Sequence, residues 1–204
     1  MLYTLIHDHN HFLKMLWDRD QIASLVGEMG SAMEQRIDMW NAPVSFKGVF
    51  TETLRVTFPV LSKEDKSCTL PDIAIDQGRL FLNERAFEVL KPLIENDGEF
   101  LPVTYEQGDA YIFIPLQTAE SVNGLNDKLS LKNDWGDMEN IAFHEERVGN
   151  WAVFRSEFNA YMSIYCNEAI KDAIEANKLT GLFITPDLAN IFPEERKDVT
   201  GLNG

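Results

Sequence analysis

The stretch 71-PDIAIDQGRLFLNERAFEVLKPLIEN-96 carries the clearest folding signal in this chain. Alternating isoleucines predict a short strand, the following Gln-Gly pair predicts a turn, and the Leu-Phe-Leu run predicts a returning strand. Asn83 then stands where the side-chain oxygen of an N-cap residue would be needed to start a helix. The apolar face expected for that helix carries Ala86, Phe87, Leu90 and Ile94. The stretch therefore predicts a β-hairpin that runs directly into an amphipathic helix.

Downstream of this unit the pattern stays rich in strands. Residues 99–119 predict two strands around Gly108, and residues 121–156 predict several short strands separated by turns. A second helix is expected over residues 167–180, with Asn167 as its cap and Gly181 just past its end. A last strand, 182-LFIT-185, follows this helix.

Upstream of the unit, the signals are weaker. Strands are expected in 2-LYTLI-6, 11-HFLKMLWDR-19 and 53-TLRVTFPV-60, and a polar surface loop in 61-LSKEDKSCT-69. A helix is expected from Ile22 to Ile37, with Asp20 as its N-cap, although two glycines weaken that pattern.

The order of these elements predicts the fold class. Hairpins dominate and the chain shows no βαβ alternation, so we expect an α+β fold with a mostly antiparallel sheet and a few helices. A chain of 204 residues suits one domain. We expect that domain to span residues 1–204, with residues 1–60 as its least clearly patterned part and residues 192–204 as a flexible tail.

The strongest compositional feature is the charge. With 33 acidic against 18 basic residues, the formal net charge is −15. Such a surface repels nucleic acid and anionic membranes and favours a basic protein partner. The chain has no basic leader with a long apolar segment and only two cysteines, so we expect a cytoplasmic protein with reduced thiols.

The acids are densest between residues 134 and 146, which hold five acidic residues and no Lys or Arg. They are Asp134, Asp137, Glu139, Glu145 and Glu146. Two interpretations are open: a surface that faces a basic partner, or a solvated face with no partner.

Three of the four histidines lie in the stretch 7-HDHNH-11. Spacing of i, i+2, i+4 would point His7, His9 and His11 to one side of a continuous strand, where they could bind a divalent metal. The intervening Asp and Asn favour a solvated turn, so a metal site here is the alternative interpretation.

Other catalytic signatures are missing from the sequence. It contains no GxGxxG, GxxxxGK[ST] or GxSxG motif. Cys166 lies near an expected helix N-terminus, but a nucleophilic thiolate would also need an activating base. Trp135, Trp151 and Phe154 are interpreted as core or sheet-covering residues. These observations predict a binding protein without a cofactor.

Two stretches, residues 70–103 and 141–185, resemble immunity proteins of bacterial polymorphic toxin systems, a family of single-domain proteins once described as uncharacterised. The resemblance rests on Pro71, Asp72, Glu84, Arg85, Leu90, Leu101, Pro102, Phe154, Arg155, Lys171, Ile174, Gly181 and Leu182. Asn83, where the family tends to have serine, and Cys166-Asn167 depart from the pattern, but both asparagines can still cap a helix.

This resemblance implies a protein that neutralises a cognate toxin by direct binding, with the toxin delivered by contact-dependent or type VI secretion. The acidic residues from Asp134 to Glu146 are then expected to face the toxin. Two alternatives remain open: a small metal-dependent enzyme that uses His7, His9 and His11, and a regulatory subunit of another basic protein.

Overall fold

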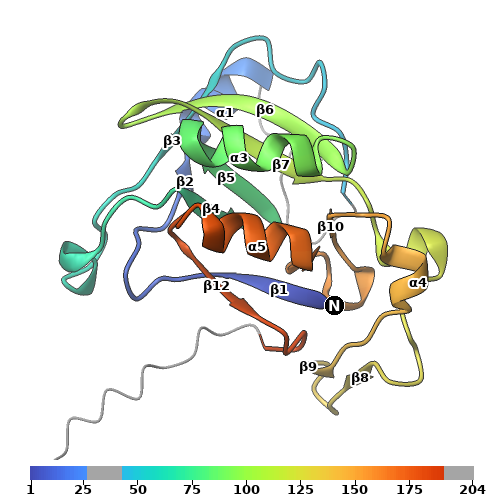
Figure 1. Ribbon diagram of the computed structural model, residues 1–204. Helices are drawn as coiled ribbons and strands as arrows, with labels where there is room; N and C mark the ends of the chain where they lie inside the picture. Colours follow the sequence, from blue (N-terminus) through green and yellow to red (C-terminus); the bar gives the residue numbers. More distant parts are fainter. Residues whose placement is uncertain (27–42, 191–204) are drawn as a thin grey trace, which may run out of the picture.

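The computed structural model describes residues 1–26 and 43–190, which form two main sheets and a small hairpin (Figure 1). Its strands are β1 Leu2–His7, β2 Leu16–Trp17, β3 Leu54–Thr57, β4 Ile73–Asp76, β5 Arg79–Asn83, β6 Gly98–Tyr105, β7 Gly108–Pro115, β8 Leu131–Lys132, β9 Met138–Asn140, β10 Val153–Phe154, β11 Ile164–Asn167 and β12 Leu182–Thr185. Its α-helices are α1 Arg19–Val26, α3 Glu84–Ile94, α4 Glu145–Val148 and α5 Glu168–Ala176. Short 3-10 turns, η1 Glu64–Ser67, η2 Ala119–Val122 and η3 Glu157–Asn159, join some of them.

The larger sheet has the strand order β2-β3-β6-β7-β5-β4, and the smaller one has the order β10-β11-β1-β12. Only the pairing of β3 with β6 is parallel among the strand pairs of the described residues. Strands β8 and β9 form a separate hairpin at the edge of the molecule (Figure 1). The predicted α+β class with a mostly antiparallel sheet is confirmed.

The unit formed by β4, β5 and α3 matches the sequence prediction. Gln77 and Gly78 both have positive φ, 48° and 75°, which turns the hairpin tightly. The side chain of Asn83 accepts a hydrogen bond from the backbone N–H of Ala86 and so caps α3. The buried residues of α3 are the predicted ones, Ala86, Phe87, Leu90 and Ile94.

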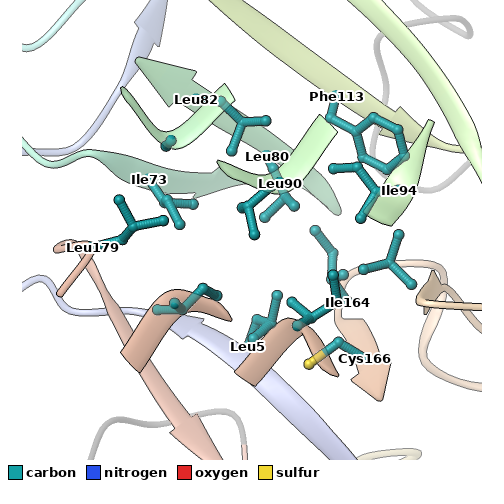
Figure 2. Packing of buried hydrophobic residues seen from close by; sticks show 14 of the residues in the cluster. Leu5, Ile73, Leu80, Leu82, Leu90, Ile94, Phe113, Ile164, Cys166 and Leu179 are labelled. Carbon is teal, nitrogen blue, oxygen red and sulfur yellow. The ribbon is translucent and has the colours of Figure 1, made fainter. Parts of the chain in front are cut away.

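Strand β5 contributes to two cores, which explains its unbroken apolar run. Leu80 and Leu82 pack into the core that contains α3 and α5 and joins the two sheets (Figure 2). Phe81 points to the opposite face, where it packs against Phe58 and Val56 of the second core. Because both faces of the larger sheet are covered at these three positions, apolar side chains are favoured at each of them.

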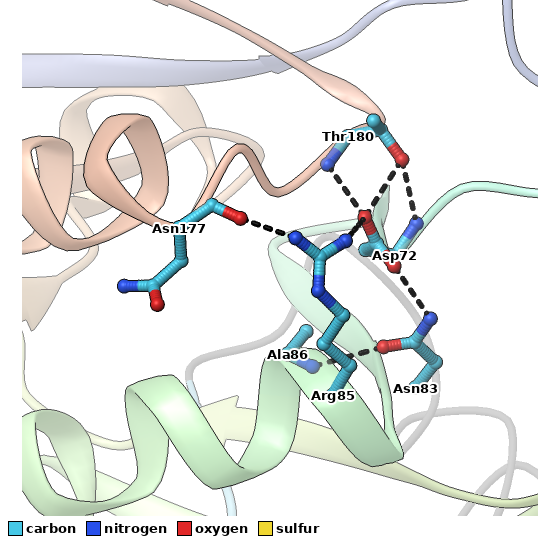
Figure 3. Close-up of polar contacts among 6 residues, drawn as sticks. All are labelled: Asp72, Asn83, Arg85, Ala86, Asn177 and Thr180. Atoms are coloured by element: carbon cyan, nitrogen blue, oxygen red, sulfur yellow. Dashed lines mark hydrogen bonds and ion pairs between the residues drawn. The ribbon is translucent and has the colours of Figure 1, made fainter.

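Asp72, just before β4, links the start of α3 to the segment that follows α5 (Figure 3). Its carboxylate accepts hydrogen bonds from the backbone N–H of Thr180 at 2.9 Å, the hydroxyl of Thr180 at 2.9 Å and the Asn83 amide at 2.8 Å. Arg85 forms an ion pair with it at 3.1 Å and also donates to the backbone carbonyl of Asn177. Several residues of the family resemblance therefore lie in a network that holds α3 to the segment after α5.

Two of the predicted elements differ from the structure. In residues 11–19 only Leu16 and Trp17 form a strand; Phe12 makes an isolated parallel bridge with Thr69, and Leu13 and Met15 pack into the second core. The N-cap of helix α1 lies two residues earlier than expected, because Asp18, not Asp20, accepts a hydrogen bond from the Gln21 N–H. The expected continuation of this helix to residue 37 and the expected tail, residues 192–204, lie outside the described residues.

Helix α5 also ends before its predicted glycine. Lys178 takes the left-handed conformation after the helix, with φ 51°, and Gly181 has another role. A Cβ atom at Gly181 would lie 1.9 Å from the carbonyl oxygen of Ile73 and 2.6 Å from the Cβ of Pro71. Glycine is therefore required where β12 approaches β4.

Within residues 1–26 and 43–190, no helix combines the length and the apolar character needed to cross a membrane.

Candidate functional site

The five acids of residues 134–146 lie in the β8–β9 hairpin and in the first turn of α4. Asp134 and Asp137 belong to the turn between β8 and β9, and Glu139 lies within β9. Glu145 and Glu146 form the first turn of α4. All five side chains are exposed. The structure thus places every predicted partner-binding residue at the surface, in one turn, one strand and one helix start.

The turn that carries Asp134 and Asp137 is held by Asn133. Its side-chain oxygen accepts hydrogen bonds from the backbone N–H of Trp135 at 3.0 Å and of Asp137 at 2.8 Å. Gly136 has φ 87°, a conformation that glycine adopts without strain. An asparagine that bonds its own turn in this way fixes the loop without tertiary packing.

Trp135 is the most exposed large apolar residue of the described chain, at 87%. The prediction that it covers the core or a sheet was wrong, whereas Phe154 is fully buried and Trp151 is half-buried as expected. Trp135 lies in the turn between β8 and β9, not in a strand that faces a core, and its backbone N–H donates to the Asn133 side chain. The sequence signal for this exposure was its place in N-D-W-G-D, between two acids and beside a turn glycine.

Two further apolar side chains are exposed near the same hairpin. Leu129 is 54% exposed and Leu131 is 52% exposed. The side-chain amide of Asn140 in β9 donates to the carbonyl oxygen of Leu129 at 2.6 Å, so this leucine is held beside the hairpin. Exposed apolar side chains surrounded by charge are typical of protein-binding surfaces. We call Leu129, Leu131, Asp134, Trp135, Asp137 and Glu139 the acidic hairpin surface.

The acids differ in their partners. Glu145 lies 3.4 Å from the N-terminal ammonium group of Met1, and Glu146 lies 3.6 Å from the Nδ1 atom of His144. In the part of the chain that the structure describes, no ion pair engages Asp134, Asp137 or Glu139. Among the described residues these three acids thus have no cationic partner, although the Asp137 carboxylate accepts a hydrogen bond from the Asn133 amide at 3.2 Å.

The three N-terminal histidines do not share one environment. His7 ends β1 and is only 9% exposed, and burial together with the neighbouring His9 lowers its pKa to about 4. His9 is exposed in the turn, and the ring of His11 contacts the Asp8 carboxylate at 2.8 Å. The expected solvated turn begins only after His7, because β1 continues to that residue. Within the described residues, no group of three or more His, Cys, Asp or Glu side chains is placed to hold a metal ion.

Two other reactive or charged groups are buried. Cys166 lies in β11, and burial raises the pKa of its thiol to about 12, so it is protonated at neutral pH. Arg155 is 2% exposed, and burial and the nearby Arg79 lower its pKa to about 9. The Nε atom of Arg155 has no hydrogen-bond partner, and no carboxylate of the described residues pairs with its guanidinium.

No model of a known protein family matches the chain, and no curated protein matches it. The resemblance to immunity proteins therefore stays a prediction, and the geometry of the surface has to support any functional proposal.

Proposed function

We propose that the protein is an immunity protein that binds a basic, cognate interbacterial toxin in the cytoplasm and neutralises it without turnover. The observation that carries this proposal is the exposed Trp135 in a rigid turn, with unpaired acids on both sides. Tryptophan is enriched among the residues that dominate protein–protein binding energy. Unpaired acids around it increase the rate of encounter with a basic partner.

The overall charge supports the same type of partner. A net charge of −15 repels nucleic acid, so a toxin with a basic substrate groove is a better match for the surface. An acidic hairpin in such a groove would take the place of the phosphates that the toxin would otherwise bind. The resemblance of residues 70–103 and 141–185 to immunity proteins agrees with this mode of action.

The test is a rescue experiment with the toxin domain encoded next to this protein's gene. Cells that express the toxin domain should survive when they co-express the wild-type chain. The variant Trp135→Ala should lose protection and raise the Kd about 30-fold, which corresponds to about 2 kcal/mol at a dominant interface residue. Its thermal stability should not change, because the side chain is 87% exposed.

A charge-reversal triple variant tests the acids separately. Changing Asp137, Glu139 and Glu146 to Lys should slow association strongly at low salt and leave dissociation less affected. A matched control reverses three exposed acids elsewhere, Glu52, Glu88 and Glu95, and so changes the net charge equally. Equal association rates for the two triple variants would refute the hairpin as the docking surface.

A further inference from the structure

A pocket of about 700 Å³ lies between β1 and the β8–β9 hairpin. Its apolar lining includes Leu5, Ile75, Met138, Phe158 and Met162, which come from four separate segments of the chain. The volume falls within the range of about 300–1,000 Å³ that is typical of small-molecule sites. The pocket is thus large enough for a ligand of about a dozen non-hydrogen atoms or more.

The charge around this pocket is opposite to that of the protein. Two lysines, Lys14 and Lys132, line it against a single acid, Asp137; His7 also lines it but is uncharged at neutral pH, because burial lowers its pKa to about 4. In the described part of the chain neither lysine forms an ion pair, although Lys132 lies over the ring of Phe158 at 4.8 Å. In a protein with 33 acids and 18 basic residues, such a local excess of cations selects an anionic ligand.

Polar atoms inside the pocket lining also lack partners. Within the described residues, the Oδ1 atom of Asn159 is buried without a hydrogen bond, and neither ring nitrogen of His7 makes a hydrogen bond of normal geometry, although the backbone of Phe12 lies close to the ring. The amide nitrogen of Asn159 is used, since it donates to the Tyr165 hydroxyl at 2.9 Å. Buried polar atoms are normally satisfied by protein, water or ligand. At neutral pH the uncharged His7 ring offers one donor and one acceptor.

We propose that this pocket binds a small apolar carboxylic acid, with its hydrocarbon part against Ile75, Phe158 and Met162 and its carboxylate toward Lys14 and Lys132. The unpartnered polar atoms of His7 and Asn159 provide hydrogen-bonding capacity for the polar end of the ligand or for water that accompanies it. The pocket shares Asp137 with the acidic hairpin surface but is not lined by Trp135, and its ligand binding can be measured without a toxin.

Decanoate and decanol are suitable probes, because they share a hydrocarbon chain and differ in charge. Calorimetric titration of the full-length protein should show saturable 1:1 binding of decanoate and at least about tenfold weaker binding of decanol, a factor that corresponds to one charge interaction of about 1.4 kcal/mol. The double variant Lys14→Glu/Lys132→Glu should weaken decanoate binding by at least about tenfold and leave decanol binding unchanged. Both lysines are exposed, so the variant should fold normally.

The matched control is Lys47→Glu/Lys63→Glu, which changes two exposed lysines outside the pocket. It should bind decanoate as the wild type does. A second variant, Met162→Glu, places an acid in the lining at a residue that is 45% exposed, and it should also weaken decanoate binding. Absence of saturable decanoate binding, equal affinities for the two probes, or equal effects of the two lysine double variants would each overturn the proposal.

Discussion

Replacement of Asp72 by alanine should lower the free energy of unfolding by about 3 kcal/mol at pH 7. Three hydrogen bonds of 2.8–2.9 Å, from Thr180 and Asn83, reach its carboxylate, which is 12% exposed. A hydrogen bond to a charged group contributes about 1.5–3 kcal/mol when buried, and partial exposure reduces each contribution. Arg85 adds little, because its side chain is 54% exposed.

The loss should depend on pH in a defined direction. Burial raises the pKa of Asp72, but the hydrogen bonds from Thr180 and Asn83 and the charge of Arg85 lower it more, so the net pKa lies below its ordinary value. A depressed carboxyl pKa gives stability that is present above the unfolded pKa of about 3.9 and is lost as pH falls through the folded pKa. The difference between wild type and variant should therefore shrink below about pH 4.

Denaturation with guanidinium chloride, followed by tryptophan fluorescence at pH 7 and at pH 2.5, measures both effects. Asp109→Ala is the matched control, because Asp109 is an exposed carboxylate in a strand and forms no ion pair within the described residues. It should cost less than about 0.5 kcal/mol. A loss below about 1 kcal/mol for Asp72→Ala, or a loss that persists unchanged at pH 2.5, would refute the assigned role of the network.

Three further predictions concern the buried residues. Leu90→Ala should cost about 3 kcal/mol in chemical denaturation, whereas Leu93→Ala on the exposed side of the same helix should cost less than about 1 kcal/mol, and equal losses would contradict the packing. The wild type should lose up to about 3 kcal/mol as pH falls from 6.5 to 4, because the unfolded chain takes up a proton that buried His7 does not; His7→Phe should remove this loss, and parallel pH profiles would argue against it. Arg155→Met should raise the free energy of unfolding by about 1–3 kcal/mol, since it removes a buried guanidinium without a counter-charge, and a lower stability would contradict this.

The sequence was sufficient for the elements whose signals are local. The Asn83 and Asn167 caps, the Gln77-Gly78 turn and the buried face of α3 all appear where the pattern predicted them. In each case the signal involves residues that lie close together in the sequence, within one or two helical turns. Capping and amphipathic periodicity act at this range, so they can be recognised without knowledge of the fold.

The sequence was not sufficient where distant segments decide the outcome. Leu13 and Met15 have the apolar pattern of a strand, but they pack into the second core. In that segment only Leu16 and Trp17 pair with β3. Gly181 was predicted to end a helix. In the structure a glycine is required there because the carbonyl oxygen of Ile73, distant in sequence, lies too close for a Cβ atom. His7 was assigned to a solvated turn, and its burial depends on the segments that pack over the end of β1.

The candidate site also combines features that the sequence predicts locally with features that depend on distant segments. The exposure of the five acids followed from their charge, but the outward position of Trp135 did not follow from its residue type, since tryptophan is more often buried. The pocket was not predicted at all, because its lining combines β1, the β8–β9 hairpin and residues around η3 that lie far apart in sequence. Neither of its lysines belongs to a recognisable motif.

The position of β1 between β11 and β12 constrains the order in which the protein can assemble during synthesis. Residues 2–7 emerge from the ribosome early, yet both of their pairing partners lie after residue 163. The larger sheet needs no residue beyond 115 and can form while translation continues. The nascent chain must therefore keep these six buried residues without their strand partners until synthesis has passed residue 185, and chaperones would be expected to bind it during this interval.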